Sequence, residues 1–143
     1  FFKPGVIVIH DRLTARRPST YQWLLHAPSA FEIAGDNLVR WSGDAGNVAV
    51  RFITPEGLRI TQTNKFDPPP AEWTNWGLVQ WHLTAETREE RKTQQFITVM
   101  VVNGGGEVAA KKTGAGYSLE IATGGKQFTL ALEGKQHRMT REE

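Results

Sequence analysis

Four histidines are the side chains of this sequence that could act as bases or bind a metal: His10, His26, His82 and His137. A zinc site needs three or four ligands at suitable spacing, but no two of these histidines form an HxH or HxxxH pair. His26 and His82 lie near corresponding ends of two similar segments, so we expect hydrogen-bonded structural imidazoles there. A role as base or ligand-binding group is the alternative. The sequence therefore predicts no catalytic residue, no metal site and no cofactor.

Two tryptophans and two arginines are the other side chains that could bind a ligand. Trp73 and Trp76 follow a run of three prolines in a long segment without strand pattern, and such loops are often functional. Their rings would suit the C–H-rich faces of sugars, although they could also pack over a sheet edge. Arg16 and Arg17 could meet an anionic glycan, a neighbouring domain or only solvent. The predicted carbohydrate-binding residues are Trp73, Trp76, Arg16, Arg17 and His82.

Alternation of apolar and polar residues predicts the strands that would position these side chains. Tyr21–Pro28 and Leu78–Thr84 each place large apolar residues on one face of a strand. Phe96–Val102 is apolar at nearly every position, which is typical of a central strand buried on both faces. Arg12–Ser19 is basic and contains a proline, so we expect it to be a connecting loop.

No segment shows ten or more residues of helical period with caps. About ten short strands separated by turn signals predict an all-β protein, an antiparallel β-sandwich that forms a single domain. We assign residues 1–133 to this sandwich and residues 134–143 to a polar C-terminal tail that should fray.

Composition limits the classes of protein that fit. The 143 residues, 39% hydrophobic and 22% charged, are typical of a globular chain, and no apolar run approaches the roughly 20 residues of a membrane helix. A net charge of +2 is too small to predict a nucleic-acid partner. The chain has no cysteine, which excludes disulfides and thiol chemistry. It opens with Phe1 and Phe2 rather than with Met, so we expect a fragment of a longer protein.

Several stretches together resemble a known family. They are Val-Ile-Val-Ile-His-Asp-Arg-Leu-Thr-Ala (6–15), Tyr-Gln-Trp-Leu-Leu-His (21–26), Arg-Phe-Ile-Thr-Pro-Glu-Gly-Leu (51–58), and an Asp-Pro-Pro-Pro element followed by Gln-Trp-His-Leu-Thr-Ala (80–85). In this order they resemble the C-terminal β-sandwich region of heparinase II/III-like polysaccharide lyases, over roughly residues 4 to 102.

The resemblance implies a secreted or periplasmic bacterial enzyme that degrades an acidic polysaccharide by β-elimination. In that family an upstream (α/α) toroid supplies the main catalytic residues, and β-sheet parts close one side of the cleft. The present chain has no such toroid, and the family's metal-site motifs lie upstream of the matching region. We therefore expect a non-catalytic accessory module whose partners are the toroid of the same protein and the polysaccharide. An independent carbohydrate-binding module and a small β-sandwich enzyme are the alternatives, and neither a nucleic acid nor a membrane is an expected partner.

Overall fold

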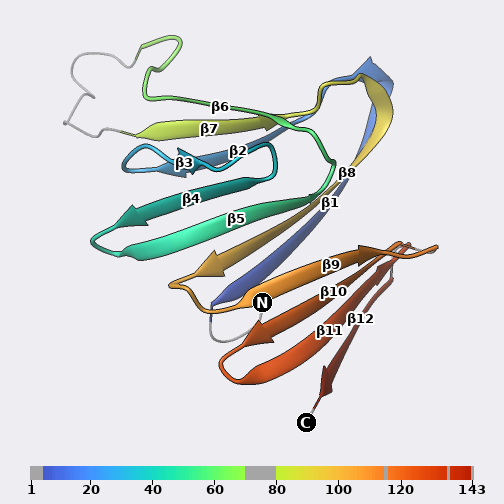
Figure 1. Cartoon of the computed structure of the whole chain (residues 1–143). Helices are drawn as coiled ribbons and strands as arrows, with labels where there is room; N and C mark the ends of the chain where they lie inside the picture. The colour runs from blue at the N-terminus through green and yellow to red at the C-terminus, as the bar shows by residue number, and fades with distance from the viewer. Residues whose placement is uncertain (1–4, 70–79, 115, 135, 143) are drawn as a thin grey trace.

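Strands make up the regular structure of this protein, as the sequence predicts. The computed structural model describes residues 5–69, 80–114, 116–134 and 136–142 (Figure 1). The twelve strands in these ranges are β1 (Val6–Ser19), β2 (Gln22–Ala27), β3 (Glu32–Ile33), β4 (Leu38–Gly43), β5 (Gly46–Thr54), β6 (Arg59–Thr63), β7 (Trp81–Glu86), β8 (Arg91–Val102), β9 (Glu107–Lys112), β10 (Gly116–Thr123), β11 (Lys126–Glu133) and β12 (Gln136–Glu142). No helix among the described residues is long and apolar enough to cross a membrane.

The strands form three antiparallel sheets. The central sheet has the order β1-β8-β5-β4-β3, and the other two have the orders β2-β7-β6 and β12-β11-β10-β9. In Figure 1 the β2-β7-β6 sheet lies at the top of the molecule and the β9–β12 sheet at the bottom. The predicted all-β antiparallel sandwich is confirmed as a single domain, with two more strands than expected.

Strand β8 contributes to both hydrophobic cores of the protein. Its residues Phe96, Ile97, Thr98 and Val99 are all buried. Phe96 belongs to the core between the central sheet and the β2-β7-β6 sheet, whereas Ile97 and Val99 belong to the core between the central sheet and the β9–β12 sheet. Successive residues of a strand point to opposite faces, so an apolar side chain at nearly every position is what a strand between two layers requires. The prediction that this segment is a central strand buried on both faces is confirmed.

The first core lies between the central sheet and the β2-β7-β6 sheet. Phe52 on β5 is 2% exposed, and the edge of the Trp23 ring from β2 meets it with ring centroids 5.3 Å apart. Leu83 and Ala85 on β7 are fully buried beside them. Trp81 packs against this core from the start of β7 but is only half-buried.

The second core joins the β9–β12 sheet to β1 and β8. Leu119 and Ile121 on β10 are buried against Val6 on β1 and Val99 on β8. Phe128 on β11 packs at its margin. The hairpin of β10 and β11 was predicted from its alternating residues, and it pairs in register from Gly116–Glu133 to Thr123–Lys126.

Two segments differ from the prediction. Arg12–Ser19 is the second half of β1 rather than a loop, because β8 extends far enough to pair with it, as Thr14 with Thr93 and, after a register shift, Ser19 with Arg91. β1 is an edge strand, so charged side chains there can remain in solvent. Residues 136–142 form β12 on the free edge of β11 instead of a fraying tail, since backbone pairing does not require apolar side chains.

Candidate functional site

The predicted site residue His82 lies on the outward face of the β2-β7-β6 sheet, in contact with other aromatic side chains. Alternation places Trp23, Leu25 and Leu83 towards the first core, so the neighbouring residues of each strand face outward. The register sets these outward residues in cross-strand rows. One row is His26, His82 and Thr63, the next is Leu24, Thr84 and Thr61, and the last is Gln22, Glu86 and Arg59.

His82 lies at the centre of an aromatic cluster at one end of this face. Its ring centroid is 4.5 Å from that of His26 on β2 and 4.6 Å from that of Phe66, which follows β6. Both contacts are edge-on, with interplanar angles of 62° and 90°. We call these three residues the imidazole–phenyl cluster.

The His82 ring has an unused polar atom. Its Nε2 is shielded from solvent and has no hydrogen-bond partner among the described residues. Burying an unpaired polar group is unfavourable, so a ligand hydroxyl or anionic group would satisfy this atom once a movement of the neighbouring side chains exposes it. Phe66 and Leu24 are exposed by 39% and 57% and add apolar surface to the same face. A face with one unsatisfied nitrogen and exposed apolar surface can bind a molecule that has both hydroxyl groups and C–H faces.

The opposite end of the same face is already paired. Glu86 accepts hydrogen bonds from Arg59 and from Gln22 Nε2, the latter at 3.0 Å. These two bonds hold the pKa of the Glu86 carboxyl below its ordinary value. Because the charges compensate one another, this end of the face is less available to a charged ligand than the imidazole–phenyl cluster.

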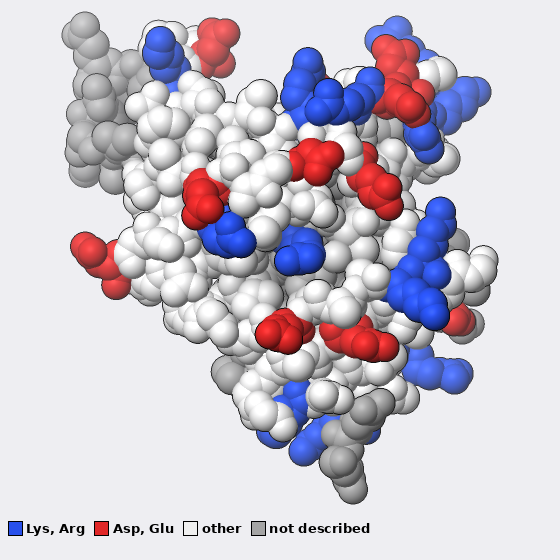
Figure 2. All heavy atoms as spheres, viewed as in Figure 1, with Lys and Arg blue, Asp and Glu red and all other residues white. Residues whose placement is uncertain are grey.

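The structure separates Arg16 and Arg17 from this cluster. Arg16 and Arg17 are exposed on β1 near the point where the chain enters β2, next to the Gln22 and Glu86 row and therefore away from His82. Figure 2 shows Lys and Arg side chains together with acidic ones at the upper right, where β1 ends and β8 begins. Trp73 and Trp76 lie outside the described residues. Their prediction as carbohydrate-binding residues therefore stays a prediction.

A histidine pair that the sequence did not indicate joins two sheets. His10 Nδ1 on β1 lies 3.0 Å from His137 Nε2 on β12, and Arg12 Nε donates to His10 Nε2 at 3.3 Å. A neutral imidazole has one donor and one acceptor nitrogen. Because His10 Nε2 accepts from Arg12, the proton of His10 is on Nδ1, which donates to His137 Nε2. Burial, then Arg12 and His137, lower the pKa of His10. The residues are far apart in sequence and β12 was expected to fray, so no sequence signal linked them.

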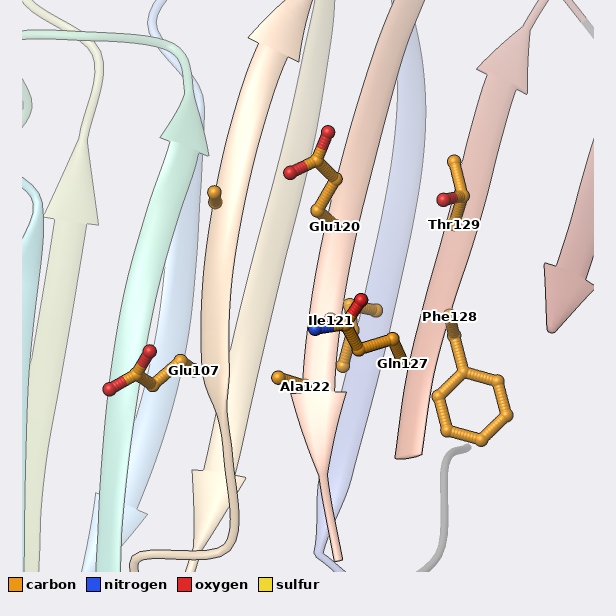
Figure 3. A pocket seen from close by; sticks show the side chains of 8 residues that line it. Glu107, Glu120, Ile121, Ala122, Gln127, Phe128 and Thr129 are labelled. Carbon is orange, nitrogen blue, oxygen red and sulfur yellow. The ribbon is translucent and has the colours of Figure 1, made fainter. Parts of the chain in front are cut away.

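The outward face of the β9–β12 sheet has a shallow hollow of about 310 Å³. Glu107, Glu120 and Gln127 border it, and Ala109 and Ala122 line it (Figure 3). The two carboxylates point in different directions in Figure 3 and do not converge on one point. Within the described ranges, no three His, Asp or Glu side chains are grouped so as to hold a metal ion.

Comparison with known proteins does not assign this chain to a family. No protein-family model matches the sequence. No curated protein matches it either. The resemblance to heparinase II/III-like lyases therefore stays a prediction.

Proposed function

We propose that this chain is a non-catalytic β-sandwich module of a heparinase II/III-like polysaccharide lyase, which stabilises the enzyme and borders its substrate cleft. Its partners are an upstream (α/α) toroid of the same protein and an acidic polysaccharide, in a secreted or periplasmic bacterial enzyme. The observation that carries the proposal is the imidazole–phenyl cluster, where the unpaired His82 Nε2 and exposed apolar surface share one open sheet face. The resemblance of residues 4–102 to heparinase II/III-like lyases is the reason for proposing a lyase as the parent enzyme.

The non-catalytic role follows from what β-elimination needs. A base must remove the proton next to a uronate carboxyl, and another group must offset the carboxylate charge. A base is commonly oriented by a hydrogen-bonded carboxylate, but no histidine of the described ranges is hydrogen-bonded to Asp or Glu. Among the described residues, the His82 ring contacts the rings of His26 and Phe66, and His10 contacts another histidine and an arginine. These arrangements fit binding and packing better than proton abstraction.

An independent carbohydrate-binding module is the second candidate. The exposure of Leu24 and Phe66 on a flat sheet face favours it, because sugars stack and pack on such surfaces. The two candidates differ in affinity: a face that only borders a cleft should bind weakly alone, since a few contacts must offset the lost freedom of the ligand.

The test combines turnover with binding on the chain itself. Incubation with heparin, heparan sulfate, alginate or hyaluronan should give no rise in unsaturated-uronate absorbance. NMR titration with the same glycans should shift amides of β2, β7 and β6 near His82, and His82→Ala should remove these shifts. Thr61→Ala, on the same face one row away, is the matched control. Turnover that His82→Ala abolishes would refute the non-catalytic assignment, and shifts confined to the β9–β12 sheet would refute the site.

A further inference from the structure

A groove follows the seam between the central sheet and the edge of the β9–β12 sheet. Strand β9 pairs with β10 on one side and has no ladder partner on the other among the described residues. Beside that open edge are two hollows of about 420 and 340 Å³. Both are lined by Glu56, Lys112 and Tyr117, so they are two parts of one groove. Ligand pockets in proteins have volumes of about 300 to 1,000 Å³, and each part reaches this range.

Several elements build the groove, and β5, β9 and the turn between β7 and β8 supply most of its lining. Arg51 and Ile53 on β5 line the smaller part of the groove, and Thr54 and the turn after it line the larger part. β9 supplies Val108 to Ala110 and Lys112. The turn between β7 and β8 closes the far end with Arg88, whose Nε donates to the Gly57 carbonyl at 2.7 Å. That bond fixes the guanidinium at the end of the groove.

The charges along the groove do not balance. Arg91 is paired with Glu89 at 2.7 Å. Arg51, Arg88 and Lys112 have no carboxylate partner in the described part of the chain, and Glu56 is the one unpaired acid among the described lining residues. In Figure 2, Lys and Arg side chains lie along the right-hand side of the molecule, over the end of β9 in Figure 1. A concave surface with excess cations attracts anions and raises their local concentration.

We propose that this seam groove binds a short stretch of an oligosaccharide that carries carboxylate or sulfate groups. Guanidinium groups form paired hydrogen bonds with such anions, and Arg51 and Arg88, in the two parts of the groove, would bind successive charged units. Tyr117 offers a ring for a sugar face, and Asn37, Thr54 and Gln94 offer partners for hydroxyl groups. The site rests on its own charges and shape. Only the preference for a glycan over another polyanion rests on the proposed function.

An acidic peptide paired with the β9 edge fits the surface less well. A peptide strand added there would need pockets for alternate side chains. β4 lies next to β5 on the side away from β8, and its exposed residues Arg40 and Ser42 are polar and offer no apolar pocket. Arg40 is already paired with Glu32 at 3.1 Å. The peptide is therefore kept as an outcome of the test.

The test measures binding of defined probes to the whole chain and to two charge variants. The probes are a heparin tetrasaccharide, a tetragalacturonate, neutral maltotetraose and a tetraglutamate peptide, followed by calorimetry and NMR at low and high salt. The variant Arg51→Gln/Lys112→Gln removes two groove charges. Its control, Lys126→Gln/Arg138→Gln, removes two exposed charges from residues that do not line the groove.

We expect one or both anionic sugars to shift amides near Arg51, Lys112 and Tyr117, and maltotetraose to leave these amides unshifted. An exposed ion pair contributes up to about fivefold in affinity, so the groove variant should bind about tenfold more weakly and the control should bind as the parent does. The sulfated and carboxylated probes decide which anion is preferred. Equal loss in both variants would overturn the proposal as unspecific charge attraction, and tighter binding of tetraglutamate would overturn it in favour of a peptide. Loss of binding in His82→Ala but not in the groove variant would overturn the groove and leave the proposed function standing.

Discussion

Replacement of two phenylalanines should separate the stability of the sandwich from ligand binding. Phe52 lies between the central and β2-β7-β6 sheets and is 2% exposed, whereas Phe66 lies on the outward face and is 39% exposed. Phe-to-Ala changes in a core cost about 3–5 kcal/mol, because apolar burial is lost and a cavity remains. Phe52→Ala also removes the edge contact with Trp23, and aromatic pairs of this kind contribute about 0.5–1.5 kcal/mol. We therefore expect a loss of about 4–5 kcal/mol for Phe52→Ala and of about 1 kcal/mol or less for Phe66→Ala.

Urea denaturation followed by tryptophan fluorescence measures both losses. Domains of this size have unfolding free energies of about 5–15 kcal/mol, and slopes of about 2 kcal/mol per molar urea are common. Phe52→Ala should then lower the midpoint by about 2 M, or prevent folding if the parent is near the lower limit. Phe52→Leu keeps most of the volume and should cost only about 1–2 kcal/mol, so it covers that case.

The binding experiment completes the comparison. Phe66→Ala should lower the midpoint by about 0.5 M or less but lose the glycan-induced amide shifts around His82. Phe52→Leu should keep those shifts, since it changes only the core. Equal midpoints for Phe52→Ala and Phe66→Ala would refute the packing described for the first core. An unchanged titration of Phe66→Ala would refute the role of the imidazole–phenyl cluster.

Two further predictions concern β12 and its histidine contact. The pKa of His10 is lowered in the folded state. Between that folded-state pKa and the ordinary value of about 6.5, the unfolded chain therefore binds more protons than the folded chain. The free energy of unfolding is thus highest above pH 6.5 and decreases as the pH falls below it. His10→Gln should flatten this part of the urea-midpoint profile measured from pH 5 to 7.5, and a profile identical to the parent's would contradict the His10–His137 contact. Deletion of residues 136–142 exposes the edge of β11 and should lower the melting temperature and increase aggregation in light scattering, whereas an unchanged melting temperature would show that the segment frays.

The sequence predicted the buried elements better than the edges, for a physical reason. The Phe96–Val102 pattern identifies a strand with apolar neighbours on both faces, because burial restricts every side chain there. The second half of β1 and β12 pair through their backbones and leave Arg16, Arg17, Arg138 and Arg141 in solvent, so their composition is that of loops. Backbone pairing at an edge depends on the length of the neighbouring strand, which local sequence does not reveal.

The candidate site was predictable only in part. The sequence placed His82 and His26 near the ends of two similar strands but did not predict that they lie directly opposite each other. It predicted hydrogen-bonded imidazoles, and this is wrong for His82, whose Nε2 has no hydrogen-bond partner among the described residues. The contribution of Phe66 was missed because it follows β6 without any alternating pattern. The contact of His10 with His137 depends on how one sheet is placed over another, and sequence spacing carries no information about that placement.

The pairing of β1 with β8 has a consequence for how the chain acquires its fold. Val6 pairs with Val101 and Thr14 with Thr93, so β1 is synthesised well before the strand with which it pairs. Bringing such distant segments together lowers the chain entropy before stabilising contacts can form. Folds dominated by such long-range pairs therefore form slowly. The hairpins β4–β5 and β10–β11 need only short turns and can form early. Until β8 has been synthesised, Val6 and Val8 lack the strand that pairs with them in the fold, so the emerging chain exposes an apolar, unpaired strand.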